Sequence, residues 1–106
     1  MRKLNISDTG ARGWFVGDFP EAALNTKSCE VCYRENVTGD FDTHYHTVCT
    51  EVILVVKGRV LMNDMIMTAG DIVVLEPGEL HKGTCLEPST VVTIKTPAGG
   101  DDKVLC

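Results

Sequence analysis

From residue 29 onward, short apolar runs rich in β-branched residues alternate with Gly, Pro, Asn and Asp. Such runs are typical of β-strands, and no stretch keeps the spacing that an amphipathic helix requires. Only residues 19–24 resemble a helical turn. The pattern predicts an all-β fold with strands over residues 29–35, 50–57, 60–62, 65–68, 72–76, 82–86 and 90–95.

Two local patterns sharpen this prediction. Asn63-Asp64 separates two apolar runs and predicts a hairpin with a tight polar turn. The run over 51–57 is apolar on both faces, since Val52 and Leu54 alternate with Ile53 and Val55. A strand that is apolar on both faces is expected to be covered on both. The outward face therefore needs a second sheet layer or a partner subunit, and we expect a homodimer.

Length and charge exclude several classes of protein. A chain of 106 residues is sufficient for one domain and too short for two. The formal charge of −5, from 10 basic and 15 acidic residues without a basic run, argues against a nucleic-acid partner. Arg2 and Lys3 are followed by no apolar stretch, and the longest apolar run, 52–56, is far too short to span a membrane. We expect a cytoplasmic protein.

The five cysteines form an odd number, which favours reduced thiols over a disulfide framework. Cys29 and Cys32 form a CxxC that suggests half of a zinc site or a redox pair. Their surroundings indicate a strand, on which positions three apart point to opposite faces. No second CxxC completes a four-cysteine zinc site. We interpret them as two cysteines of a strand.

The placement of the three histidines indicates candidate chemistry. His44 and His46 are two residues apart, so both side chains leave an extended segment on the same side. Glu51 has the opposite parity and requires a bend over 47–50, and His81 follows a Pro-Gly turn. Three imidazoles and a carboxylate suit Fe, Mn, Ni, Co, Cu or Zn. By spacing alone, ordinary surface or core histidines are an equal alternative.

The segment around the first two histidines resembles the first motif of the cupin superfamily. That motif is a glycine, five residues, His-x-His, three or four residues, a glutamate, six residues and a glycine. His44, His46, Glu51 and Gly58 fit this spacing, and Gly39 lies one residue closer to His44 than the motif requires.

The second cupin motif is partly present. Gly70, Gly78 and His81 fall on its pattern of glycine, five residues, Pro-x-Gly, two residues and histidine. Glu76 stands where the proline is expected, and Cys85 replaces the final asparagine.

The resemblance implies a single-domain cupin jelly-roll β-barrel over 1–106, with a lead segment of about 1–28, motif 1 over 39–58 and motif 2 over 70–85. It also implies one divalent transition metal (Fe, Mn, Ni, Co, Cu or Zn) held by His44, His46, Glu51 and His81. Cys85 lies four residues after His81, on the same side of a regular strand. We expect it in the wall of a substrate pocket rather than as a metal ligand.

Cupins of this kind include dioxygenases, decarboxylases and isomerases, so the resemblance does not select a reaction. We expect a metal-dependent enzyme that acts on a small organic acid, a diol or enol, or a sugar derivative. The alternative is a non-catalytic module that binds a small ligand and holds a structural metal. A metal-free sugar epimerase is disfavoured, because it needs a histidine base and all three histidines are assigned to the metal.

Overall fold

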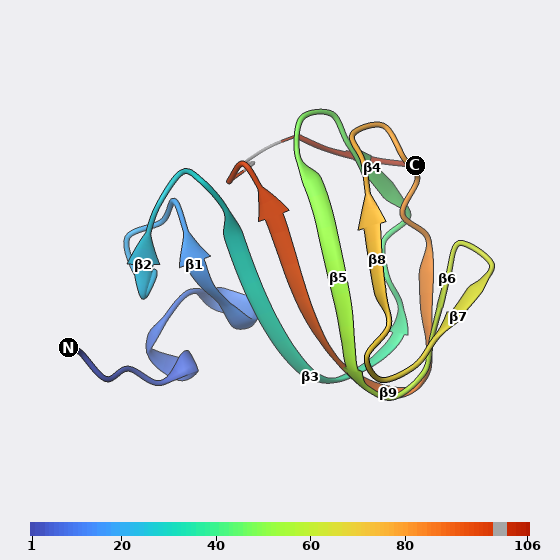
Figure 1. Cartoon of the computed structure of the whole chain (residues 1–106), viewed down its shortest axis with the longest axis horizontal. Coiled ribbons are helices and arrows are strands. Elements are labelled where there is room, and N and C mark those ends of the chain that lie inside the picture. Colours follow the sequence, from blue (N-terminus) through green and yellow to red (C-terminus); the bar gives the residue numbers. More distant parts are fainter. Residues whose placement is uncertain (99–101) are drawn as a thin grey trace.

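The computed structural model, which describes residues 1–98 and 102–106, is built almost wholly from strands (Figure 1). Two short 3-10 helices, η1 (Ile6–Asp8) and η2 (Ala11–Gly13), precede the first strand. The strands are β1 (Trp14–Gly17), β2 (Leu24–Asn25), β3 (Glu30–Asp40), β4 (His44–His46), β5 (Thr50–Lys57), β6 (Val60–Met62), β7 (Met65–Met67), β8 (Ile72–Leu75), β9 (Gly83–Thr96) and β10 (Lys103–Leu105). The helices of the described residues are far too short to cross a membrane.

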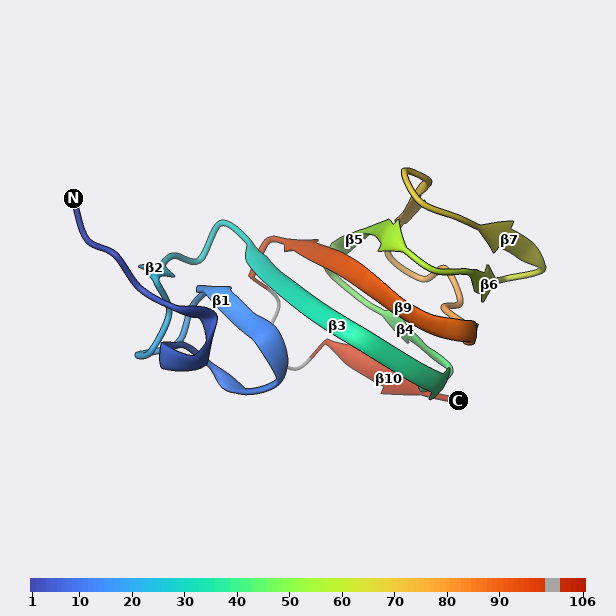
Figure 2. The same cartoon turned by 90° about the horizontal axis from the view of Figure 1, so that it is seen from below.

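The main sheet has the strand order β2-β1-β3-β9-β5-β8, and all of its pairs except β1 with β2 are antiparallel. The hairpin β6–β7 joins the same sheet through β9, and β4 pairs separately with β10. Figures 1 and 2 show β3 and β9 running side by side along most of their length. These two long strands connect β1 and β2 on one side with β5, β8 and the β6–β7 hairpin on the other.

The two ends of β9 pair with different strands. Residues 90–96 of β9 pair with β5, whereas residues 83–85 pair with β6. The register with β3 shifts between Arg34 and Val37 and again before Gly39, and Asn36 has a φ of 53°. Such bulges bend a strand and increase its twist. The apolar core is formed by side chains of β5, β6, β7, β8 and β9. It contains Ile53, Val55, Val60, Met62, Met67, Leu75, Cys85 and Val91.

The structure confirms the all-β prediction and most of the expected strands. β5 and β6 have the predicted bounds, and β6 and β7 form the predicted hairpin. Its turn residues Asn63 and Asp64 have φ values of 44° and 72°. Two consecutive positive φ values are those of a type I′ turn, whose twist matches that of the flanking strands.

Other local predictions were wrong. Residues 19–24 form no helical turn; a turn at 20–21 leads into β2 instead. The segments 82–86 and 90–95 are one strand, because the Glu87-Pro88 interruption lies where β9 is bent and exposed, and proline is tolerated at such positions. The strands β1, β2 and β10 were not predicted, since runs of two to four residues carry no clear alternation.

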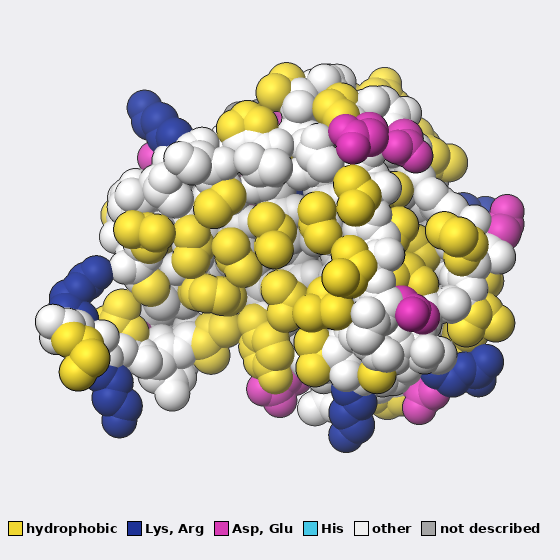
Figure 3. Space-filling view, in the orientation of Figure 1, with side chains coloured by type: hydrophobic (Ala, Val, Ile, Leu, Met, Phe, Trp, Pro, Cys, Tyr) yellow, Lys and Arg dark blue, Asp and Glu magenta, His cyan; other side chains and the backbone are white. Residues whose placement is uncertain are grey.

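The outer face of the main sheet is apolar, as the two-sided pattern of β5 predicts. The inner residues Glu51, Ile53 and Val55 are buried, and the intervening residues point outward. Figure 3 shows hydrophobic side chains gathered over this face. We define the outer apolar face as Val52 and Leu54 of β5 with their neighbours Ile72, Val74 and Ile94.

We propose that a second copy of the chain covers the outer apolar face, because Ile72 and Val74 are 62% and 50% exposed. Val74→Glu should then convert a dimer into a monomer. Ile66→Glu, which changes an equally exposed apolar residue on β7, should leave the dimer intact. Light scattering distinguishes these states, and a wild-type mass near the single-chain 11.5 kDa at micromolar concentration contradicts the proposal.

Candidate metal centre

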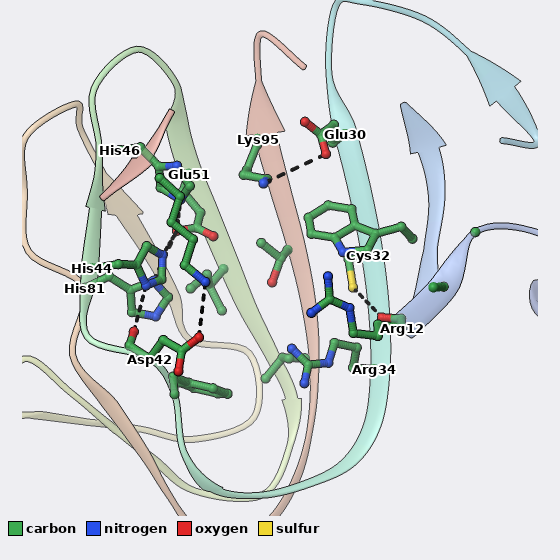
Figure 4. A pocket seen from close by; sticks show the side chains of 18 of the residues that line it. Arg12, Glu30, Cys32, Arg34, Asp42, His44, His46, Glu51, His81 and Lys95 are labelled. Carbon is green, nitrogen blue, oxygen red and sulfur yellow. Dashed lines mark hydrogen bonds and ion pairs between the residues drawn. The ribbon is translucent and has the colours of Figure 1, made fainter. Parts of the chain in front are cut away.

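Two short strands and one bend bring the first three predicted ligands together. His44 and His46 occupy alternate positions of β4 and are both buried, while Tyr45 between them is half-buried. The chain bends at residues 47–48, as the parity of Glu51 predicts, and returns as β5. Glu51 therefore points back toward both imidazoles (Figure 4).

The donor atoms of these three residues surround a common point. Oε2 of Glu51 lies 3.7 Å from Nε2 of His46 and 4.0 Å from Nε2 of His44. All three ligand atoms lie within 4.8 Å of one another. Ligand atoms about 2.1 Å from one ion are separated by roughly 3 Å, so a small contraction of this arrangement would complete the coordination.

His81 lies beside His44 and contacts Glu51, but it is not a member of the group of three whose ligand atoms lie within 4.8 Å of one another. Its backbone forms two hydrogen bonds with His44, from His44 N to His81 O (3.0 Å) and from His81 N to His44 O (2.6 Å). Its Nδ1 lies 3.1 Å from Oε2 of Glu51. Its Nε2 is buried, without a hydrogen-bond partner among the described residues. A buried nitrogen of this kind is costly unless a further group satisfies it, which fits a metal site.

Hydrogen bonds behind the imidazoles orient their Nε2 atoms toward Glu51. Nδ1 of His44 donates to the carbonyl oxygen of Asp42 at 2.7 Å, and Nδ1 of His46 donates to Oδ1 of Asp102 at 2.8 Å. When Nδ1 donates, a neutral ring presents an unprotonated Nε2, which is the form that binds metals. Burial lowers the pKa of His44, which favours its neutral form.

Asp102 was not predicted from the sequence. β10 pairs with β4 so that Lys103 lies opposite His46, and this pairing brings the buried Asp102 carboxylate behind the imidazole. The carboxylate also accepts hydrogen bonds from the backbone N–H groups of Val48 (3.1 Å) and Cys49 (2.8 Å). Burial by itself would raise the pKa of Asp102, but these hydrogen bonds outweigh it and lower the pKa below its usual range.

The atoms of His46, Cys49 and Asp102 also lie close enough together to hold a metal. Burial and the neighbouring Asp102 carboxylate raise the pKa of the Cys49 thiol to about 12, so the thiol stays protonated. The Asp102 carboxylate of this group already accepts hydrogen bonds from Nδ1 of His46 and from the backbone N–H of Cys49. We therefore interpret this second group as the hydrogen-bonded support of His46.

The carboxyl group of Glu51 is ionised despite its burial. Burial would raise its pKa, but the hydrogen bond from His81 and the charges of His81, His46 and His44 lower it. A carboxylate together with imidazole nitrogens is a donor set that divalent transition metals prefer.

These side chains lie at one side of a cavity of about 750 Å³. His44, His46, Glu51 and His81 line it together with residues on the inner face of β1, β3 and β9. Figure 4 shows Lys95, Glu30 and two arginines across the cavity from the histidines. An ion held by the predicted ligands would thus face a space large enough for a small organic molecule.

The structure places Cys85 elsewhere than predicted. The side chain is buried, as expected, but it belongs to the apolar core and is not among the described residues that line the cavity. Cys85 pairs with Val60 of β6, in the part of β9 beyond the bend. The parity argument assumed a straight strand, and the bend of β9 moves this residue away from the cavity.

The structure agrees with the interpretation of the CxxC as strand cysteines. Cys32 is buried in β3, and Cys29 directly precedes that strand. Neither belongs to a potential metal-binding group among residues 1–98 and 102–106. Cys32 Sγ donates instead to the carbonyl oxygen of Arg12 at 3.3 Å.

Comparison with known proteins supports the fold. No family model matches this sequence, and no relative is found among curated proteins. A Klebsiella pneumoniae protein with a double-stranded β-helix domain is 20% identical, with a TM-score of 0.69 over 99% of this chain and 91% of that one. An RmlC-like cupin from Shewanella frigidimarina is 23% identical, with a TM-score of 0.60 over 74% and 73%. A variant of Streptomyces PAC13 with uridine is 15% identical, with a TM-score of 0.70 over 100% and 91%.

These similarities define the class of fold. The chain has the jelly-roll-type β fold of the cupins, as the two sequence motifs imply. The His and Glu cluster of this cupin fold is compatible with a metal site.

The contact between Asp102 and His46 predicts an effect on metal affinity. Asp102→Asn should weaken metal binding by about 10- to 100-fold, because the amide no longer fixes the ring by a charge-assisted hydrogen bond. Asp42→Asn is the matched control, since Asp42 contacts His44 through its backbone oxygen and its carboxylate is exposed. Competition with a chromogenic chelator measures both affinities. Equal affinities in the two variants would show that Asp102 has no such role.

The lowered pKa values of His44 and Glu51 predict a pH dependence of the metal-free protein. Both groups bind protons less tightly in the folded state than at their ordinary values of 6.5 and 4.5. Their contribution to stability is therefore present above those values and is lost as the pH falls, first below 6.5 for His44 and then below 4.5 for Glu51. Urea unfolding at a series of pH values tests this. A free energy of unfolding that rises on acidification from neutral pH, or a profile that His44→Gln leaves unchanged, contradicts it.

Proposed function

We propose that this protein is a metal-dependent enzyme of the cupin fold that acts on a small organic acid, a diol or enol, or a sugar derivative. The observation that carries the proposal is the position of His44, His46, Glu51 and His81 at the side of a cavity of about 750 Å³. A purely structural metal needs no such space, because its ligands close around it. The uridine in the PAC13 variant is consistent with small-molecule binding by this fold.

The residues of the chain have separable roles in this proposal. His44, His46, Glu51 and His81 would hold one divalent transition ion (Fe, Mn, Ni, Co, Cu or Zn). Such an ion would polarise an oxygen atom of a bound molecule. The hydrogen bonds from His44 and His46 to Asp42 and Asp102 would keep both Nε2 atoms unprotonated and aimed at the centre.

The alternative, a non-catalytic module that binds a small ligand and holds a metal, uses the same residues. It differs from the enzyme in one measurable property, which is turnover. The reaction class, whether dioxygenase, decarboxylase or isomerase, is part of what the experiment determines.

The test begins with metal content. Wild-type protein refolded with metal should hold about one ion per chain, and the double variant His46→Ala/His81→Ala should hold none, because it loses two of four ligands. Elemental analysis measures both, and Asp42→Asn should retain its metal. An empty wild-type protein would refute the metal centre.

The second part of the test measures turnover. Metal-loaded protein is incubated with a panel of small acids, diols and sugar derivatives, and oxygen uptake and product formation are followed by electrode and NMR. Turnover that is lost in the double variant supports the enzyme. A metal-loaded protein that binds members of the panel without converting any of them identifies the binding module instead.

A further inference from the structure

The cavity carries a second group of polar side chains, away from the predicted metal ligands. Arg12 of η2 and Arg34 of β3 both line it. Figure 4 shows their guanidinium groups side by side, across the cavity from His44 and His46. These two positive charges belong to elements that the sequence motifs do not include.

Neither arginine is neutralised by the described part of the chain. Two ion pairs at the cavity involve lysines, Lys95 with Glu30 (3.9 Å) and Lys103 with Asp42 (3.3 Å). Among the described residues, no ion pair involves Arg12 or Arg34. Two further carboxylates, those of Glu21 and Asp40, line the cavity, and Asp40 accepts a hydrogen bond from the hydroxyl of Thr84 at 2.8 Å. Within residues 1–98 and 102–106, neither guanidinium group therefore forms an ion pair with a carboxylate.

The backbone holds Arg12 in an unusual conformation. Arg12 has φ 57° and ψ 31°, in the left-handed region that residues with a Cβ atom rarely adopt. Gly13 follows with φ 85°, and a Cβ atom there would collide with the backbone carbonyl of Tyr33. The Arg12 carbonyl accepts a hydrogen bond from the thiol of Cys32. Backbone strain that is maintained by such close packing is often associated with function.

Arg34 is held by the regular part of the sheet. It follows Glu30 and Cys32 at alternate positions of β3, and all three side chains line the cavity. Arg34 pairs across the sheet with Val91, another residue of the cavity wall. The register shifts directly after Arg34, so this residue is the last inward position before the bulge.

A guanidinium group presents a planar fork of N–H donors that matches a carboxylate or a phosphate. Two adjacent guanidinium groups repel each other, and an anion that binds between them relieves this repulsion. We propose that Arg12 and Arg34 form an oxyanion-binding subsite, so that the small molecule bound in this cavity carries a carboxylate or phosphate at its end remote from the metal centre. The inference rests on the proposed function only for the metal-bound end of that molecule. The subsite narrows the proposed substrates, which include acids, diols, enols and sugar derivatives, to molecules that carry a negative charge.

The test compares acids that differ only at the remote end. α-Ketoglutarate and α-ketovalerate share a chelating head and chain length, and only the first has a second carboxylate. α-Ketoadipate and α-ketocaproate form a longer pair. Calorimetry with cobalt-loaded protein should show that at least one diacid binds roughly tenfold more tightly than its monoacid.

Variants assign the preference to the two arginines. Arg12→Gln and Arg34→Gln should each bring the affinities of diacid and monoacid together, while monoacid affinity and metal content stay at wild-type levels. Arg34→Lys should restore part of the preference, because it keeps the charge. Lys57→Gln, which removes an exposed cation at the end of β5, is the matched control and should keep the full preference.

Inorganic phosphate as a competitor distinguishes the two oxyanions. If phosphate displaces the diacid more readily than the monoacid, the subsite accepts phosphate as well as carboxylate. If it displaces neither while the diacid preference holds, the subsite is selective for carboxylates.

The same titrations on metal-free protein separate this inference from the proposed function. A diacid preference that depends on the arginines supports the subsite even if the chain takes up no metal. Equal affinities for diacid and monoacid, or a preference that survives both arginine variants, overturn the oxyanion subsite. In that case, metal-dependent binding of both acids would still leave the proposed function intact. Binding of neither acid in either form also overturns the subsite.

Discussion

The buried carboxylate of Glu51 is the constraint around which this fold is arranged. An ionised carboxylate without partners is very costly to bury, so its surroundings must supply compensating groups. Here the imidazoles of His44, His46 and His81 all lie within 4.0 Å of its Oε2 atom. They come from two separate segments, β4 and the residues around His81, and both must be held in place beside β5 for the carboxylate to be tolerated. A metal ion at this position would supply further positive charge.

The support extends outward through a chain of hydrogen bonds. His46 contacts Glu51 on one side and Asp102 on the other, and the Asp102 carboxylate is in turn held by the backbone N–H groups of Val48 and Cys49. The bend between β4 and β5, which aims Glu51 at the histidines, is thus stabilised by a residue from near the C-terminus. Buried polar networks of this kind are favourable only when nearly every member has a partner. Among the described residues, the buried Nε2 of His81 has no hydrogen-bond partner, which is compatible with a further group at this centre.

The cavity beside this centre has two chemically different ends. Neutral imidazoles and a carboxylate suit a divalent ion at one end, and the guanidinium groups of Arg12 and Arg34 suit an oxyanion at the other. The bend of β9 creates this arrangement, because it leaves residues 91, 93 and 95 facing the cavity and places Cys85 in the apolar core. β9 therefore contributes side chains both to the cavity wall and to the apolar core, and Val91 belongs to both.

The sequence by itself determined the all-β class, the strands β5 and β6, the Asn63-Asp64 hairpin and the convergence of His44, His46, Glu51 and His81 on one cavity. The strands and the hairpin follow from alternation and spacing within short segments, which local geometry largely decides. The convergence of the four residues was instead implied by the resemblance to the cupin motifs. Only the tertiary structure decided that Asp102 supports His46, that Arg12 lies across the cavity from the candidate metal ligands and that Cys85 lies in the core. The first depends on the pairing of β10 with β4, the second on a left-handed turn packed against β3, and the third on the bend of β9. Contacts between segments so far apart in the chain depend on strand register and curvature, which no local pattern of residues encodes.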